Sequence, residues 1–217
     1  LGIGWPATVA GDASGDLIGC CRAVRSSPAA VEALLAAIVK TTPRAAAPGW
    51  RESYYAIRRS YNSESTSAID RAAFLLYLMA RGFNGVLRVN RGGKFNVPIG
   101  DVPRPAYPTA AELARFAEVT RSWTFRLADF EETIADACEG DVLYADPPYA
   151  GTFGGYVAGG FSAADQVRLA DALARARDQG VHVLHTNSTF EGVWALYRAR
   201  GFWTLPTAES RAVNRDV

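Results

Sequence analysis

The sequence has few of the residues from which disulfide frameworks and metal sites are built. Its 217 residues include only three cysteines and two histidines. Cys20 and Cys21 are adjacent and Cys138 is distant, a pattern that is neither a disulfide framework nor a zinc-binding spacing. We therefore predict free thiols and a reducing, cytoplasmic setting.

Long apolar runs are also missing, so we predict no membrane partner. Apolar residues make up 49% of the chain and charged residues 21%, as in an ordinary globular protein. The length allows one sizeable core, or one domain with a smaller insert.

The sequence also lacks a strong net charge, because the total is only +1. The charge is nevertheless unevenly distributed along the sequence. Residues 51–104 carry nine basic and four acidic side chains, a net charge of +5, so the rest of the chain is acidic. This asymmetry predicts that one segment approaches phosphate groups and that the remainder does not.

Apolar periodicity and capping residues predict helices that alternate with strands. We expect helices over 16–42 (interrupted at Ser27-Pro28), 68–83, 108–122, 162–180 and 191–202, and strands over 6–12, 124–130, 142–144 and 181–188. Residues 42–53, punctuated by Pro and Gly, predict a boundary. His182 and His185 fall in the last strand and are predicted to be core residues.

Carboxylates stand at the ends of three of these strands: Asp12, Asp129 and Asp146. Open α/β sheets bind their ligands at the carboxyl ends of the strands. The alternation of helices and strands therefore predicts an α/β fold with a doubly wound sheet that binds a small ligand there.

The stretch VLYADPPY (142–149) joins a predicted buried strand to a stiff turn. Pro147 cannot donate to a sheet ladder, so the strand must end before it. Two consecutive prolines restrict the backbone, which gives Asp146, the Pro147 carbonyl and the Tyr149 ring fixed relative positions. An ordinary proline-rich surface turn is the alternative.

Residues 84–100 interrupt the alternation of helices and strands. The pairs Asn84-Gly85 and Gly92-Gly93 flank an alternating stretch, which is a hairpin signature. The segment 43–106 therefore reads as an insert. Asn84 and Asn90 could serve as turn formers alone.

At D-P-P-Y (146–149) the sequence resembles the Dam-type DNA adenine methyltransferase family. Three other segments carry the likeness: GDASGDLI (11–18) is similar to the family's D-x-N-x-D-L-I, FNGVLRVNRGGKFNVPIG (83–100) to its target-recognition hairpin, and LADF (127–130) to the strand end beside the cofactor. HTNS (185–188) lies where the family often has Ser-Asn. Ser14 replaces the usual Asn. The family's glycine-rich cofactor turn is not in these residues, so we expect both ends to be trimmed and the turn to lie upstream of Leu1.

The resemblance implies a Rossmann-like doubly wound methyltransferase sheet with an inserted, mainly helical target-recognition domain that carries a β-hairpin. The catalytic, cofactor-binding domain would comprise residues 1–42 and 107–217. The target-recognition insert would comprise residues 43–106.

The resemblance also implies methyl transfer from S-adenosylmethionine, without a metal, to the 6-amino group of adenine in duplex DNA, at a GATC-like site. It assigns the catalytic turn to Asp146, Pro147, Pro148 and Tyr149. It assigns cofactor binding to Asp12, Ala13, Asp129, Phe130 and Asp146. It assigns DNA binding to Phe83, Asn84, Arg88, Asn90, Arg91 and Lys94.

Two alternatives stay open. Related enzymes methylate cytosine amines, RNA or a glutamine amide, but they more often have Ser or Asn before P-P-Y, so Asp146 favours adenine. The chain could also be a DNA-binding module of the same fold that has lost catalysis. We predict a monomer in the cytoplasm, associated with the nucleoid, and leave a restriction endonuclease partner open.

Overall fold

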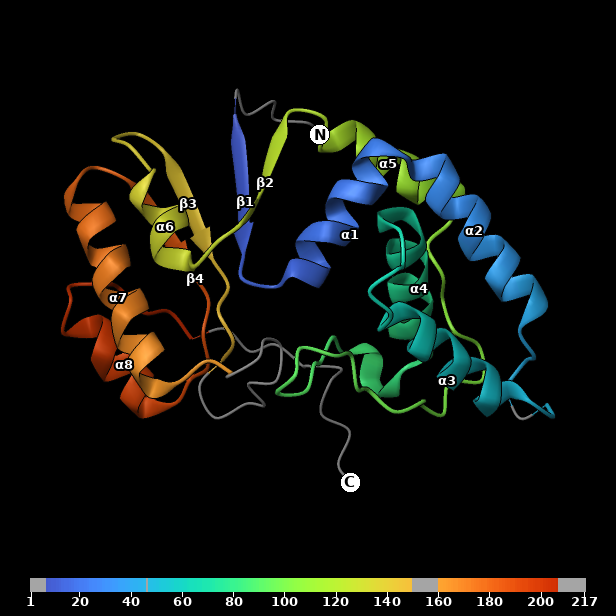
Figure 1. Ribbon diagram of the computed structural model, residues 1–217. Coiled ribbons are helices and arrows are strands. Elements are labelled where there is room, and N and C mark those ends of the chain that lie inside the picture. The colour runs from blue at the N-terminus through green and yellow to red at the C-terminus, as the bar shows by residue number, and fades with distance from the viewer. Residues whose placement is uncertain (1–6, 46, 150–159, 207–217) are drawn as a thin grey trace. The chain divides into compact units, whose positions relative to one another are not determined.

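The computed structural model describes residues 7–45, 47–149 and 160–206 (Figure 1). The termini of the predicted catalytic domain, 1–6 and 207–217, lie outside them. The chain forms two compact units, unit 1 (Leu1–Leu127) and unit 2 (Ala128–Val217). Within the described ranges no helix is long and apolar enough to cross a membrane.

Unit 1 is mainly helical, and α4 packs against α1, α2 and α3 (Figure 1). Polar caps fix where two of its helices, α4 and α5, begin. The Ser67 side chain accepts a hydrogen bond from Asp70 N, and Thr109 and Glu112 form a reciprocal capping box. The helices are α1 (Gly15–Ser26), α2 (Pro28–Thr41), α3 (Trp50–Tyr61), α4 (Ala68–Arg81) and α5 (Ala110–Val119).

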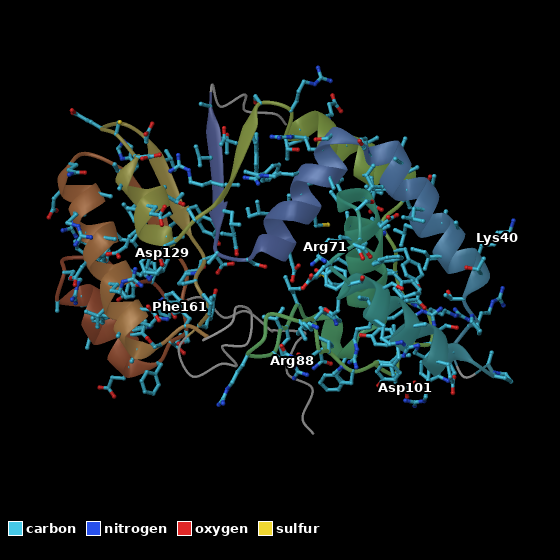
Figure 2. All side chains as sticks on the ribbon, viewed as in Figure 1. Lys40, Arg71, Arg88, Asp101, Asp129 and Phe161 are labelled. Carbon is cyan, nitrogen blue, oxygen red and sulfur yellow. The ribbon has the colours of Figure 1, made fainter. Side chains whose placement is uncertain are left out.

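Aromatic side chains from α3 and α4 form much of the core of unit 1. Tyr54, Tyr61 and Tyr77 are almost fully buried, together with Leu75 and Leu78. An ion pair at 3.1 Å between Arg71 and Asp16 joins α4 to α1 (Figure 2). The core of unit 1 is therefore built mainly from helices, with buried side chains of the segment 87–99 packed against them, rather than from a sheet.

A two-stranded parallel sheet completes unit 1. Strand β1 (Thr8–Asp12) pairs with β2 (Trp123–Leu127), and the register places Asp12 opposite Leu127. Phe125 is buried on one face, whereas Val9 is exposed on the other. The pairing places Asp12 at the carboxyl end of this sheet.

The predicted hairpin segment has less regular structure than its sequence pattern indicates. It begins with a short 3-10 turn, η1 (Phe83–Gly85), and has no regular strand. Isolated antiparallel bridges join Gly82 to Ile99 and Val89 to Phe95. The Asn62 side chain at the end of α3 binds both the N–H and the carbonyl of Phe95, at 2.9 and 3.0 Å, and so attaches the segment to the helices.

Unit 2 packs helices against a second parallel pair of strands (Figure 1). Leu169, Leu173 and Ala176 of its longest helix lie in the core with Tyr197. Ser162 and Asp165 form a capping box that fixes the start of that helix. The elements are α6 (Phe130–Ala135), β3 (Val142–Ala145), α7 (Ala163–Asp178), β4 (His182–His185) and α8 (Glu191–Arg198).

The burial of β3 and β4 corrects two sequence predictions. Residues 142–144 were expected to form a buried strand, but Val142 is 55% and Tyr144 is 59% exposed. His182 was expected in the core and is exposed, whereas His185 is partly buried. The strands pair with each other and pack on the helices of the unit through the opposite face, which holds Leu143 and Val183.

Candidate active site

The D-P-P-Y turn directly follows β3, and its first residue is held from β4. Asp146 is exposed and comes immediately after the last strand residue, Ala145. The Ala145 carbonyl accepts a hydrogen bond from Thr186 N at 3.0 Å, which extends the parallel pairing by one residue. The Thr186 hydroxyl donates to Asp146 Oδ1 at 2.6 Å. The carboxylate is therefore fixed by the neighbouring strand end.

The second half of the turn is held from α7 by a buried amide. Gln166 is only 6% exposed, and its Nε2 donates to the Pro148 carbonyl at 3.0 Å. Its Oε1 accepts from Asn187 Nδ2, also at 3.0 Å. Gln166 thus connects the turn to the segment that follows β4.

Asp129 and Phe130 lie at the start of α6 in the same unit. Asp129 caps that helix, and its Oδ1 accepts from Glu131 N at 2.9 Å and from Arg168 at 3.0 Å. The centres of the Phe130 and Phe161 rings are 5.8 Å apart (Figure 2). The Arg168 guanidinium lies over the Phe130 ring, 4.8 Å from its centre. Helix α7 supplies both Gln166 and Arg168, so side chains of one helix hold both Asp129 and the D-P-P-Y turn.

Asp12 lies in unit 1, as the last residue of β1. Its Oδ1 accepts from Ser14 N at 2.6 Å, and Ser14 caps α1 by accepting from Leu17 N. Ser14 is buried and Ala13 is exposed. The replacement of the family's usual Asn by Ser therefore leaves a working helix cap.

Each of the three predicted carboxylates has the same pattern of hydrogen bonds within its own unit. In Asp12, Asp129 and Asp146, Oδ1 accepts a hydrogen bond that fixes the side chain. No donor among the described residues binds the Oδ2 atoms of these side chains. Each carboxylate is thus oriented while keeping an acceptor for the hydroxyl or amine donors of a ligand, the groups that a nucleoside carries.

The predicted DNA-binding residues cluster on the segment 83–94 of unit 1. Phe83 is 48% exposed beside Asn84, whose φ of 54° is left-handed. Arg91 and Lys94 are exposed, as expected of phosphate contacts.

Two of the predicted DNA-binding residues have partners within or next to the segment itself. Arg88 donates from Nε to Asn96 Oδ1 at 2.8 Å and from a terminal nitrogen to the Asn96 carbonyl at 3.2 Å. Asn90 Oδ1 accepts from the N–H groups of Gly92 and Lys94. Asn90 therefore holds a turn through its Oδ1 atom, and Asn96 orients Arg88.

Sequence reasoning missed Thr186, Gln166 and Arg168. A signal for Gln166 was available, because its amide falls on the apolar face of the predicted helix 162–180, in phase with Leu169, Ala170 and Leu173. A polar residue in that position needs a buried partner. Nothing comparable marks Thr186 or Arg168, whose partners are distant in sequence.

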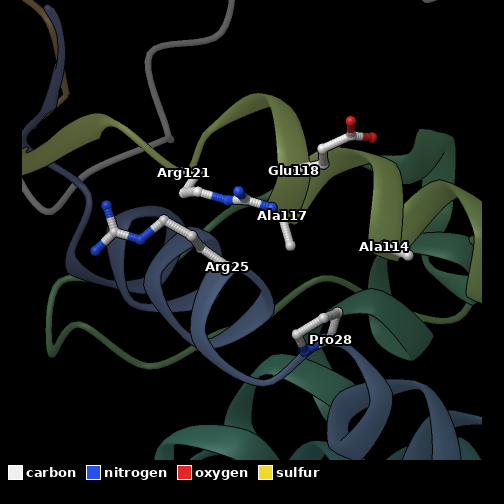
Figure 3. A pocket seen from close by; sticks show the side chains of 6 residues that line it. All are labelled: Arg25, Pro28, Ala114, Ala117, Glu118 and Arg121. Atoms are coloured by element: carbon white, nitrogen blue, oxygen red, sulfur yellow. The ribbon is translucent and has the colours of Figure 1, made fainter.

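One pocket of unit 1 contains none of the predicted site residues (Figure 3). It has a volume of about 410 Å³ and lies between α5 and the junction of α1 and α2. Its lining consists of Arg25, Pro28, Ala114, Ala117, Glu118 and Arg121. Within the part of the chain that the structure describes, no cluster of His, Cys, Asp or Glu could hold a metal ion.

Comparison with known proteins agrees with the predicted family. The family model of D12 class N6 adenine-specific DNA methyltransferase matches residues 6–211. The retron Ec67 DNA adenine methylase of Escherichia coli is 41% identical over 148 residues, 67% of this chain and 51% of that protein. The DNA adenine methylase of Vibrio cholerae is 39% identical over 154 residues, 68% of this chain and 55% of that protein.

A more complete match is a type II methyltransferase of Lactococcus lactis subsp. cremoris, 30% identical over 200 residues, 88% of this chain and 68% of that protein. The chain spans about half of the length of the Escherichia and Vibrio relatives. The family match covers both units, from β1 through the D-P-P-Y turn to the segment after α8. The chain therefore belongs to the D12 class N6 adenine-specific DNA methyltransferase family.

Proposed function

We propose that this chain carries the catalytic and DNA-contacting parts of an enzyme that transfers a methyl group from S-adenosylmethionine to the 6-amino group of adenine in duplex DNA. The observation that carries the proposal is the D-P-P-Y turn, in which Asp146 is exposed after β3 while Thr186 and Gln166 hold both halves of the turn.

The turn presents acceptors for the two hydrogens of an exocyclic amine. That amine is a poor nucleophile, because its lone pair is delocalised into the base. Asp146 and the Pro147 carbonyl accept hydrogen bonds from its two N–H groups and so favour a pyramidal nitrogen with a directed lone pair. Positive charge that develops on the nitrogen then lies beside a carboxylate, which stabilises the transition state more than the ground state.

Tyr149 provides an aromatic face on which a base that has left the duplex can stack. Pro148 restricts the backbone between the two acceptors and this ring. The contribution of the two prolines is thus to fix positions before the substrate arrives.

The cofactor site is assigned to the two other carboxylates and their neighbours. Asp12, next to Ala13, accepts from the ribose hydroxyls, and Asp129 accepts from the amine of the cofactor's adenine. Phe130 offers an apolar face beside Asp129. When bound, S-adenosylmethionine supplies an electrophilic methyl group on its sulfonium.

DNA contacts are assigned to the segment 83–94. Arg88, oriented by Asn96, reads a base edge of a GATC-like site. Arg91 and Lys94 contact phosphates, and Phe83, with Asn84 beside it, inserts into the opened duplex. Asn90 holds the turn that carries these residues.

The proposed organisation is a Rossmann-like doubly wound catalytic domain (1–42 and 107–217) with a target-recognition insert (43–106). The basic charge of residues 51–104 and the attachment of Phe95 to α3 support an insert that binds DNA. A monomeric state and a location at the nucleoid stay predictions, and a restriction endonuclease partner stays open.

The test is methyl transfer from labelled S-adenosylmethionine to duplex DNA by the intact protein and its Asp146→Ala variant. We expect the substitution to lower the rate by about 100- to 1000-fold or more while leaving DNA affinity nearly unchanged. Asp178→Ala, at the exposed end of α7, serves as the control. An active Asp146→Ala variant would refute the catalytic assignment, and an inactive parent that binds DNA would favour the binding-module alternative.

A further inference from the structure

The acceptors of the D-P-P-Y turn are held by side chains that come from two other elements of unit 2. The donor to Asp146 is Thr186, which follows β4, and the donor to the Pro148 carbonyl is Gln166 of α7. Asn187 then donates to Gln166 Oε1. The segment after β4 is thus bonded to the turn twice, directly through Thr186 and indirectly through Asn187 and Gln166 of α7.

The Thr186 contact decides how the Asp146 carboxylate is oriented. Its distance of 2.6 Å is that of a strong hydrogen bond from a hydroxyl to a carboxylate oxygen. Because Asp146 is exposed, packing alone does not fix its side-chain rotamer. The hydroxyl holds Oδ1 and so determines where Oδ2 points. Thr186 is fixed in turn by the hydrogen bond that its backbone N–H donates to the Ala145 carbonyl.

The Gln166 contact decides the backbone of the turn. The ring of Pro148 already fixes its φ, and a hydrogen bond to its carbonyl fixes its ψ. The Pro147 carbonyl lies on one side of this residue and Tyr149 on the other. A buried amide that uses both its donor and its acceptor has little freedom to move, so it is a rigid support.

The geometry points to Thr186 and Gln166 as positioning residues for methyl transfer: Thr186 orients the Asp146 carboxylate, and Gln166 sets the backbone on which the Pro147 carbonyl and the Tyr149 ring lie. This inference rests on the proposed function of the turn. Neither side chain needs to touch the substrate, because each acts through a group that does. Their loss should therefore lower kcat and leave KM for DNA and for S-adenosylmethionine nearly unchanged.

The first experiment compares Thr186→Val and Thr186→Ser in the intact protein. Valine keeps the shape and loses the donor, whereas serine keeps the donor. We expect valine to lower kcat by about 10- to 100-fold, the effect of a small displacement of a reacting group, and serine to restore most of the rate. Thr189→Val, at an exposed position of the same segment, is the matched control. Equal kcat values for the valine and parent proteins would overturn the assignment of Thr186.

Gln166→Leu tests the second support, with Val167→Ala on the exposed side of α7 as its control. We expect Gln166→Leu to lower kcat without raising either KM. Thermal unfolding of each variant reports whether it is folded. A fall in kcat that only parallels lost folded protein would overturn the role of Gln166.

A second readout needs no turnover. NMR order parameters of the Asp146 and Tyr149 amides should fall in Thr186→Val and Gln166→Leu and stay unchanged in the two controls. An inactive parent would refute the proposed function but leave this comparison in place. Unchanged order parameters in both variants would overturn the positioning role whether or not the parent is active.

Discussion

Arg168 donates a hydrogen bond to Asp129 Oδ1 at 3.0 Å and to Glu131 Oε2 at 2.6 Å, and also lies over the ring of Phe130. One guanidinium from α7 thus contacts three consecutive residues at the start of α6. The Arg168 and Asp129 side chains are 42% and 39% exposed. Pairs with that exposure contribute little to stability, so the arrangement is better suited to orienting Asp129 and Phe130.

We predict that Arg168→Ala weakens binding of S-adenosylmethionine by about tenfold, equivalent to ~1.4 kcal/mol. The reason is that Asp129 loses the donor that orients it, and Phe130 loses the cation over its ring. The free energy of unfolding should change by less than about 1 kcal/mol. Titration calorimetry and denaturant unfolding measure the two quantities.

Arg175→Ala is the matched control for this prediction. Arg175 also lies on α7 and pairs with Glu131, but at 3.4 Å and with 63% of its side chain exposed. It has no contact with Asp129 among the ion pairs of the described residues. Equal weakening by both substitutions would show a general effect of charge rather than orientation of Asp129.

The sequence predicted the elements that have strong local signals. The break between α1 and α2 follows from Ser27 and Pro28, and the start of α7 follows from Ser162. It missed helix α3 and placed a boundary over 42–53, whereas α3 begins at Trp50, directly after Gly49, whose φ is 80°. It also missed the short helix α6, which Asp129 caps from a position read as strand.

For the site, sequence patterns located the residues at the strand ends but not those that hold them. Asp12, Asp129 and Asp146 stand beside prolines, caps or strand ends that mark them locally. Thr186 and Arg168 act on partners 40 and 39 residues away, and such pairs depend on strand pairing and helix packing. The burial of β3 was misjudged for the same reason, since an apolar stretch does not show which of its faces a helix covers.

A second prediction separates base reading from phosphate contact in the segment 83–94. Arg88→Ala should relax the preference at one base pair near the target adenine, because a bidentate arginine–guanine contact contributes about 1–3 kcal/mol of discrimination. Lys94→Ala should weaken binding to all duplexes alike and reduce the salt slope by about one. Methylation rates on a panel of single-base-pair variants measure the first effect, and DNA binding at several salt concentrations measures the second. If Arg88→Ala slows every substrate equally, Arg88 contacts the backbone instead.

A third prediction concerns Gly100, which lies close to the backbone of Gly82 and Phe83. A Cβ added to Gly100 would lie 2.9 Å from the Gly82 carbonyl oxygen and 3.0 Å from Phe83 Cα. Because both neighbours are backbone atoms, Gly100→Ala should destabilise the protein by about 1–3 kcal/mol. Gly19→Ala in α1 meets nothing within 4 Å and should stabilise by about 1 kcal/mol. Denaturant unfolding that ranks the two variants in the opposite order would contradict this close packing at Gly100.

The fourth prediction is a pH dependence of stability that arises at His185. Its ring lies 3.9 Å from the Tyr197 ring and 6.2 Å from that of Phe202, and burial lowers the pKa of His185 from its ordinary value of 6.5. The folded protein therefore binds fewer protons at this site than the unfolded chain. By linkage, stability is highest above the ordinary pKa, falls as the pH drops through it, and levels off below the lowered pKa of the folded state.

The pKa values of Asp165 and Asp171 are also lowered, by hydrogen bonds from Ser162 and Arg200 respectively. Their ordinary value is 3.8, so their contribution is lost in more acidic solution and does not overlap the window of His185. Between about pH 7 and pH 5 the unfolding free energy should fall in the parent protein and much less in His185→Phe. His182→Gln, at the exposed histidine of β4, should keep the fall. Urea unfolding across this pH range is the measurement. If the unfolding free energy of His185→Phe falls with pH as steeply as that of the parent, the titrating group lies elsewhere.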